Sequence, residues 1–358
     1  MRVRFLALIL LIAFLSSPVP TNRVDKLFLV YMAADNNLYI QGMGDILEME
    51  EAKKDNLKVI ALVDDKTGTR IEEITDREEI IEERKNEDSG DPEVLFKFLN
   101  FALSTYQANE IVLVMWGHGD GRNFKGRKGK GICFDETHSD FLTIGEIRDV
   151  LSKIKERFNR KIDILIFDAC FMQSIEVSYE LRDYVDFVLG SQTYIPLDGL
   201  PYDEVITTFS ESKSDLKTLS VNIAEAYFNS YNNGSQGNEN VTFSVIDTSY
   251  TDEIKNFVNS IIPILISKDD VLSVREKYEV PMNEKYIDFI SFINDTLDEN
   301  KTFKFISLIK NLVVVEFNNF DSRFKGVSIY FPPYFFPINL SFFSDSGWEE
   351  FLWHRFAQ

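Results

Sequence analysis

The stretch IDILIFDACFM, residues 162–172, joins a buried type of strand to a short run of reactive side chains. Its first half is apolar with almost no alternation, which is typical of a strand covered on both faces of a sheet. Four other stretches share this pattern: residues 26–34, 57–63, 111–116 and 185–190. Segments with helical spacing separate all of them. This order predicts a parallel sheet, so we expect the N-terminal half to be a doubly wound α/β domain.

The connecting helices are expected over residues 38–53, 92–107, 143–158 and 172–182. Asp91, which a proline follows, and Thr143 stand where side-chain caps begin helices. Residues 64–90 are strongly charged, and we expect them to form an exposed stretch. Residues 131–135 and 141–142 predict two short additional strands.

Beyond residue 200 the pattern becomes mainly helical. The expected elements are helices at 202–210 and 215–229, a flexible loop at 232–240, a strand at 241–246, a mostly helical region at 251–312 and a late strand at 326–331. We therefore expect an α/β domain over residues 26–248. A helix-rich C-terminal region, residues 249–358, is expected to pack on it.

Charge and composition narrow the classes of function. The chain has 358 residues, of which 44% are hydrophobic, so it can bury a sizeable core. Its net charge of −20 opposes binding to a nucleic acid, because phosphates would be repelled and the only basic cluster is residues 125–130. The acidity has two interpretations, which are solubility and attraction of a basic ligand.

The N-terminus has the pattern of a signal peptide over residues 1–17. Arg2 and Arg4 precede an apolar run at 5–15, and two serines and a proline follow it. The run is too short for an ordinary membrane-spanning helix. We expect a secreted, periplasmic or cell-surface protein, with a membrane association only if this segment is retained as an anchor.

Two reactive side chains follow neighbouring strands of the predicted sheet. His118 comes after the strand at 111–116, and Cys170 comes after the strand at 162–167. Ligands of parallel sheets bind beyond the carboxyl ends of the strands, so the imidazole and the thiol are expected to face each other there. A nearby imidazolium lowers a thiol pKa and favours the nucleophilic thiolate. The Gly119 amide is placed to stabilise a developing oxyanion.

Each of these residues also has a structural interpretation. Cys170 alone fits a small buried side chain, and His118 alone fits a hydrogen-bonded turn residue. Cys133, in an apolar run, is expected to be inert packing, and His138 and His354 have no motif around them. With two cysteines the chain forms one disulfide or none, and no His/Cys spacing predicts a structural zinc site.

Four ordered motifs resemble the clostripain family of cysteine peptidases. They are VYMAADNNL at 30–38, WGHG at 116–119, DACFM at 168–172 and GVSIYFP at 326–332. This family shares the caspase-like fold with gingipains, legumains and caspases. The resemblance implies a caspase-like three-layer α/β/α sandwich with a mostly parallel sheet. It also implies a His118/Cys170 dyad, cleavage after Arg or Lys, and maturation by cleavage between the two residues.

The implied mechanism assigns further roles. Cys170 would form the acyl-enzyme, His118 would protonate the leaving amine, and the amides of Gly119 and Cys170 would form the oxyanion hole. A basic substrate side chain needs a carboxylate partner, and the family's acidic pocket position corresponds to Asp198. Asp168, two residues before the nucleophile, is a second candidate. Both also fit ordinary turn or capping roles.

Two further sets of residues complete the expected substrate machinery. Ser191 and Gln192 belong to a segment expected to form a wall of the substrate pocket, where a peptide would pair with exposed backbone. Lys125, Arg127, Lys128 and Lys130 form the expected processing loop, since flexible loops of small and charged residues are easily cut. The alternative is a solvated loop that is never cleaved.

The function that these features predict is an exported cysteine endopeptidase acting on peptides or proteins after a basic residue. The main alternative is a catalytically silent caspase-like binding or scaffold module, and a weaker one is an acyl-transferring enzyme. The sequence requires no cofactor. The resemblance adds calcium as a candidate, although no EF-hand loop is present and the ligands of any metal are unknown.

Overall fold

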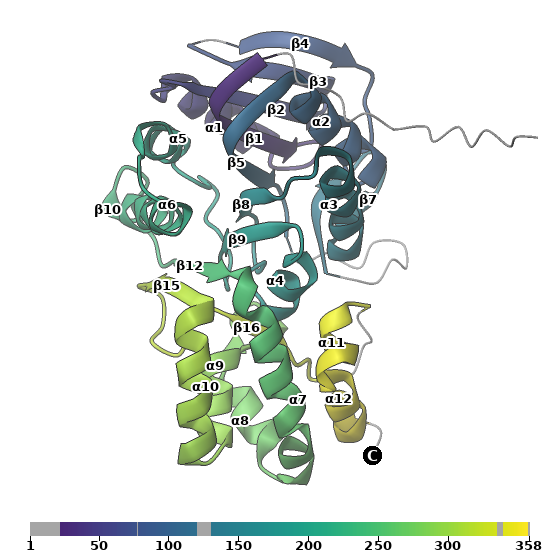
Figure 1. Ribbon diagram of the computed structural model, residues 1–358, viewed down its shortest axis with the longest axis vertical. Coiled ribbons are helices and arrows are strands. Elements are labelled where there is room, and N and C mark those ends of the chain that lie inside the picture. The colour runs from purple at the N-terminus through teal and green to yellow at the C-terminus, as the bar shows by residue number, and fades with distance from the viewer. Residues whose placement is uncertain (1–21, 77, 120–129, 335–338, 357–358) are drawn as a thin grey trace, which may run out of the picture.

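The computed structural model describes residues 22–76, 78–119, 130–334 and 339–356, and a nine-stranded sheet runs through it (Figure 1). The strand order is β15-β12-β9-β8-β5-β1-β2-β3-β4. These strands are β1 (Asn22–Ala33), β2 (Leu57–Asp65), β3 (Gly68–Ile74), β4 (Glu78–Arg84), β5 (Tyr106–Trp116), β8 (Ile162–Asp168), β9 (Val185–Gly190), β12 (Thr242–Asp247) and β15 (Val313–Asn318). The five central strands, from β9 to β2, are parallel, and two antiparallel strands extend each side.

Two apolar layers sandwich the sheet. Successive residues of β1 alternate between them, with Leu29 and Tyr31 in one layer and Val30 and Met32 in the other. On the first face lie α2 (Pro92–Thr105), α3 (Ile144–Phe158) and α4 (Ile175–Leu181). On the second lie α1 (Tyr39–Glu51), α5 (Tyr202–Glu211) and α6 (Leu216–Ser230). The three-layer sandwich expected from the sequence is therefore confirmed.

The helix starts that the sequence predicted are also confirmed. The Asp91 side chain accepts a hydrogen bond from the Glu93 amide at the start of α2. Thr143 and Glu146 form a reciprocal capping box at the start of α3. Both arrangements satisfy amide groups that have no partner inside the first helical turn.

The charged stretch at 64–90 is exposed over residues 79–83, as expected, but most of its other described residues are buried or half-buried and it contains two strands that were not predicted. Two strands, β3 and β4, lie there and extend the sheet next to β2 in antiparallel pairing. The short hairpin of β10 (Asn232–Gly234) and β11 (Gly237–Asn238) likewise occupies part of the expected loop at 232–240. Strands at an exposed edge carry many polar residues, so their composition resembles that of a loop.

The C-terminal region gathers beyond the β12 and β15 side of the sheet (Figure 1). Its helices are α7 (Thr251–Ser267), α8 (Val271–Lys277), α9 (Phe289–Thr296), α10 (Glu299–Leu312), α11 (Ser341–Ser346) and α12 (Trp348–Phe356). A small sheet joins β13 (Glu279–Val280), β14 (Asn283–Asp288) and β16 (Ser328–Tyr330), the last lying within the expected late strand. The boundary expected at residue 248 stays a prediction. The main sheet crosses it, because β15 pairs with β12.

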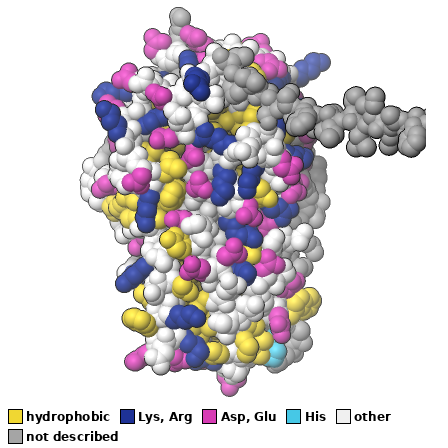
Figure 2. Space-filling model, viewed as in Figure 1, with side chains coloured by type: hydrophobic (Ala, Val, Ile, Leu, Met, Phe, Trp, Pro, Cys, Tyr) yellow, Lys and Arg dark blue, Asp and Glu magenta, His cyan; other side chains and the backbone are white. Residues whose placement is uncertain are grey.

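A second small sheet pairs β6 (Gly131–Asp135) with β7 (Asp140–Thr143), as the sequence predicted. The face of the molecule in Figure 2 carries interspersed acidic and basic side chains without a continuous basic stripe. Within the described ranges, every helix is too short or too polar to cross a bilayer.

Candidate active site

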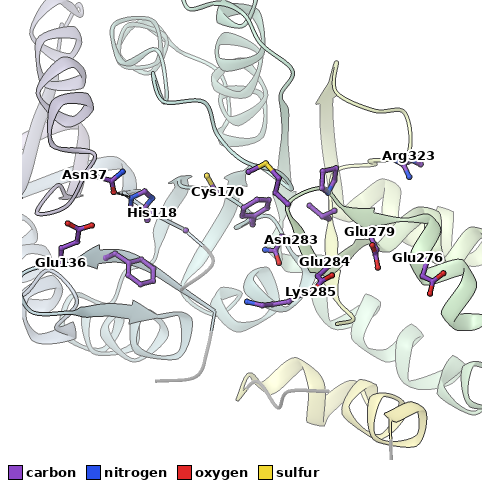
Figure 3. Close-up of a pocket in the computed structure, with 16 residues that line it drawn as sticks. Asn37, His118, Glu136, Cys170, Glu276, Glu279, Asn283, Glu284, Lys285 and Arg323 are labelled. Atoms are coloured by element: carbon purple, nitrogen blue, oxygen red, sulfur yellow. Dashed lines mark hydrogen bonds between the residues drawn. The ribbon is translucent and has the colours of Figure 1, made fainter. Parts of the chain in front are cut away.

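The pairing of β5 with β8 brings the two reactive residues to one edge of the sheet. These strands are parallel neighbours, and Trp116 at the end of β5 lies opposite Asp168 at the end of β8. His118 and Cys170 each follow two residues later. Both side chains line a pocket of about 930 Å³ (Figure 3). The expectation that the two strands are neighbours is therefore confirmed.

The far wall of this pocket comes from the C-terminal region. The turn between β13 and β14 supplies residues 281 and 282, and Asn283, Glu284 and Lys285 follow them along β14 (Figure 3). Met282 is 83% exposed and has a left-handed backbone with φ of 66°, so a large apolar side chain stands at the rim. The sequence assigned no functional role to this hairpin. The hairpin lies more than 100 residues from Cys170 along the chain, so only the folded structure shows that it lines the pocket.

A hydrogen bond orients the imidazole of His118. Its Nε2 lies 2.7 Å from Oδ1 of Asn37, which belongs to the turn after β1 (Figure 3). An amide oxygen only accepts, so this assignment places the proton on Nε2 and leaves Nδ1 as the basic nitrogen. The His118 carbonyl accepts from the Cys133 amide at 3.2 Å, which fixes the backbone against β6. Asn37 stood in a recognised motif, but its role was not predicted.

The backbone presents the Cys170 sulfur beside a second loop. The thiol is partly exposed, and its sulfur accepts a hydrogen bond from the Ile195 amide at 3.3 Å. The next residue, Phe171, has a φ of 61°, a conformation that costs a non-glycine residue about 1 kcal/mol. Its amide donates to the Thr193 carbonyl at 2.8 Å, which helps hold the strained turn. Strain of this kind is characteristic of functional turns.

The backbones of Gly119 and Cys170 are in direct contact. A Cβ atom on Gly119 would lie 2.2 Å from the Cys170 carbonyl oxygen and 2.9 Å from its amide nitrogen. Only glycine fits this approach. The two backbones that were expected to supply an oxyanion hole are thus adjacent, while that role stays a prediction.

The second cysteine lies in a different environment. Cys133 is buried in β6, and burial raises the pKa of its thiol well above the usual value. Both cysteines are free thiols, so the alternative of a disulfide is wrong. His138 pairs with Asp135 at 2.9 Å, and His354 lies in α12.

The two expected specificity carboxylates come from segments that meet at Gly199, because Asp168 ends β8 and Asp198 follows the Ile195 contact with Cys170. Asp168 is only 4% exposed and accepts hydrogen bonds from the Tyr202 hydroxyl at 2.9 Å and the Leu200 amide at 3.3 Å. Burial raises its pKa to about 6. Asp198 is exposed, and Gly199 next to it packs on the Asp168 carboxylate. Neither lines the pocket of His118 and Cys170.

Helix α1 adds two carboxyls that the sequence analysis missed. Asp45 accepts a hydrogen bond from the Trp116 indole at 2.6 Å, and Glu48 accepts one from the Tyr202 amide at 3.0 Å. Burial, with smaller contributions from neighbouring carboxylates that include Asp198 and Asp168, raises the pKa of Glu48 to about 7. The i, i+3 spacing of two acidic residues on one helix face was the available signal. We call Asp45, Glu48, Asp168 and Asp198 the acidic group.

Ser191 and Gln192 do not have the expected exposed position. Both side chains are buried, and their hydrogen bonds are made within the protein. The Ser191 hydroxyl bonds that of Thr242, while Gln192 donates to Asp288 and Ser328 and accepts from the Gly326 amide. These bonds give both side chains a structural role. The expectation that a peptide pairs with the backbone of this segment stays a prediction.

Lys130 also differs from the expectation of an exposed loop residue. Its side chain is buried, its ammonium donates to the Ser174 hydroxyl at 3.1 Å, and it stands 4.0 Å from the centre of the Tyr286 ring. The other expected processing residues, Lys125, Arg127 and Lys128, lie outside the described residues. Cleavage in this loop stays a prediction.

Comparisons with known proteins point to one family. A sequence model described as the clostripain family matches residues 30–326. Clostripain from Hathewaya histolytica is 32% identical over 226 residues, which are 51% of this chain and 42% of clostripain. The match thus spans less than half of clostripain's own length.

Solved structures show the same fold. A secreted C11 cysteine protease from Bacteroides thetaiotaomicron, in complex with an irreversible peptide inhibitor, aligns with a TM-score of 0.71 at 23% identity over 91% of this chain and 99% of its own. An inactive zymogen C11 protease from Parabacteroides distasonis aligns with a TM-score of 0.70 at 20% identity, over 92% and 99%. The caspase-like fold expected from the resemblance is confirmed.

The environments of the two thiols predict selective chemical labelling. Iodoacetamide should alkylate Cys170 much faster than buried Cys133, and His118→Ala should slow labelling of Cys170 by at least tenfold, because the imidazole no longer promotes the thiolate. Peptide mass spectrometry over time measures both rates. His354→Ala is the matched control and should label like the unmodified chain. Equal rates with and without His118 would favour the catalytically silent module.

Proposed function

Because the chain belongs to the clostripain family of cysteine peptidases, we propose that it is an exported endopeptidase that cleaves peptide bonds after Arg or Lys. The observation that carries this proposal is the convergence of His118 and Cys170 on one pocket from the ends of adjacent parallel strands. An extended peptide fits between the strand ends and the hairpin of the C-terminal region.

The chemistry follows from the two side chains. The Cys170 thiolate attacks the scissile carbonyl and forms a tetrahedral oxyanion, for which the amides of Gly119 and Cys170 are the candidate donors. The oxyanion collapses, the C–N bond breaks, and His118 gives the leaving amine the proton that it took from the Cys170 thiol. A water molecule then loses a proton to His118 and attacks the thioester. This second attack releases the acid and regenerates the thiol.

The acidic group supplies a partner for a cationic substrate side chain. Two of its members, Asp168 and Asp198, flank the turn that continues from the Cys170 sulfur contact at Ile195. A guanidinium or ammonium removed from water needs an opposite charge, and a carboxylate in a half-buried site provides it. The resemblance to the clostripain family implies the same preference for a basic residue.

Substrate series should expose this preference. Fluorogenic peptides with Arg or Lys before the scissile bond should show a kcat/KM roughly 100-fold above those with Leu, the size expected for a desolvated charge pair. Asp198→Asn should lower the value for Arg about tenfold and leave that for Leu unchanged. Asp269→Asn, an exposed change distant in sequence, is the control. Equal turnover of Arg, Asp and Leu substrates would refute the specificity.

The raised pKa of Asp168 predicts a pH-dependent preference. Its pKa is about 6 in the folded chain, so the carboxyl is neutral below that pH and anionic above it. The ratio of kcat/KM for Arg over Leu should therefore rise as the pH increases through about 6. Titration of the dyad affects both substrates and cancels in the ratio. Asp168→Asn should remove the part of the rise near pH 6 while the part from Glu48, whose pKa is about 7, stays. A rise near pH 6 that is unchanged in this variant would contradict the role.

We extend the proposal to export and maturation. Residues 1–17 have the signal-peptide pattern but lie outside the described residues, and one of the structurally similar proteases is described as secreted. Cleavage after Lys125, Arg127, Lys128 or Lys130 would divide the chain between β5 and β8. The two pieces would stay together because those strands pair in the sheet. A cut after Lys130 requires its side chain to leave Ser174 and Tyr286.

Self-cleavage is testable with the inactive variant. Purified full-length chain should convert to two fragments on a denaturing gel while eluting as one species in gel filtration, and Cys170→Ala should stay a single chain. Mass spectrometry of the fragments locates the cut. Active preparations that remain one chain would show that processing is not part of maturation.

A further inference from the structure

The pocket of His118 and Cys170 has room for more than the residue before the scissile bond. Its volume is about 930 Å³, which is enough for several amino-acid side chains, and its far wall is the turn between β13 and β14 (Figure 3). Asp168 and Asp198, the candidate partners of the basic substrate side chain, do not line it. The space between the dyad and the hairpin is therefore available to other side chains of the substrate.

Apolar side chains line this space from both sides. Phe171 follows the nucleophile, and Phe134 lies in β6 next to the residue whose amide bonds the His118 carbonyl. Pro281 and Met282 line it from the tip of the hairpin. An apolar side chain placed between these residues would be removed from water on both sides, which favours its binding.

Met282 contributes little to the stability of the fold. Of the large apolar side chains that the structure describes, it is the most exposed, at 83%. Its backbone is left-handed, with φ of 66°, a conformation that glycine or asparagine adopts at lower cost. A side chain that buries almost no surface and strains its own backbone gives folding no advantage. Burial against a bound apolar group is the remaining way in which this side chain can gain free energy.

The hairpin that carries Met282 is fixed at its base by one buried side chain. Arg275, which is 3% exposed, donates from Nε to the Phe331 carbonyl at 2.7 Å. Its two terminal nitrogens bond the Glu279 carboxylate and the Glu284 carbonyl, one on each strand of the hairpin. A wall that is ordered before binding loses little conformational entropy when a ligand packs on it. Met282 therefore faces the pocket from a preorganised support.

We propose that Met282 is a specificity-determining residue that binds an apolar side chain of the substrate, at a position other than the one before the scissile bond. The inference rests on the proposed peptidase function and adds a second requirement to the basic residue. The occupant is a part of the substrate, because the wall that carries Met282 is continuous with the pocket of the dyad.

The charged residues of the hairpin do not favour one sign of charge. The Glu279 carboxylate is paired with the buried guanidinium of Arg275. Glu284 and Lys285, which follow Met282 along β14, have opposite charges. Apolar contact with Met282 is therefore the stronger source of selectivity at this wall.

Positional scanning of peptides tests the assignment. Internally quenched peptides keep Arg before the scissile bond and carry Leu, Gly, Asp or Lys at one of three positions before this Arg or three positions after the bond. At one of these positions Leu should raise kcat/KM about fivefold above Gly and Asp, because part of its side chain is buried against Met282. Met282→Asn should remove this difference by raising KM with little change in kcat.

Matched variants separate the contact from a change in the fold. Asparagine also adopts the left-handed backbone, so Met282→Asn should melt like the parent chain, and Met282→Leu should keep the preference. Phe303→Gln removes an apolar side chain that is 79% exposed in α10 and should leave every ratio unchanged. The assignment is overturned by a Leu preference that persists in Met282→Asn, by the lack of one at every position, or by a stronger preference for Lys at the position concerned.

A minimal substrate separates this inference from the proposed function. Benzoyl-arginine with a fluorescent leaving amine has no second amino-acid side chain, so the parent and Met282→Asn should cleave it equally. A parent chain that leaves it intact would refute cleavage after Arg and not the contact. The contact is also measured on Cys170→Ala, by fluorescence polarisation with a labelled peptide that carries Leu at all six scanned positions. Adding Met282→Asn to that chain should weaken binding about fivefold, and equal binding would overturn the contact.

Discussion

The parallel pairing of β5 with β8 is the constraint on which the site depends. It places Trp116 opposite Asp168 and so brings the next residues of both strands to one edge. Along the chain, 51 residues separate His118 from Cys170. Backbone hydrogen bonds of the ladder, buried under helices on both faces, hold the geometry. The pairing of the central strands therefore sets the relative positions of the groups at this edge.

The support of the Cys170 turn extends into the C-terminal region. The segment after β9 holds the Cys170 turn, because Thr193 accepts from Phe171 and Ser191 accepts from Gln173. Gln192 in the same segment is fixed in turn by the Gly326 amide. The GVSIYFP motif at 326–332 therefore acts at a distance. The amide of Gly326, its first residue, fixes Gln192, and the segment that contains Gln192 holds the Cys170 turn. The motif therefore supports the site although it has no reactive side chain.

The elements that the sequence predicted correctly are those that depend on residues close to one another in the chain. Apolar runs gave the central strands, and Asp91 and Thr143 marked helix starts, because each signal lies within a few residues. The roles of Asn37 and Met282 depend on chain segments that only folding brings together, so no pattern of neighbouring residues predicts them. Side-chain direction was equally hidden. Ser191 and Lys130 lie next to the expected machinery in sequence, yet both point into packed protein.

Buried carboxyl groups are concentrated around this edge of the sheet. The acidic group lies by the Cys170 loop, and Asp88 and Asp135 meet near the support of His118. Solubility does not explain carboxyls that water hardly reaches, since burial opposes their charge. A cation that joins such carboxyls offsets this cost. The proposed substrate would supply one to the acidic group, because its basic side chain would enter with each turnover and leave with the product.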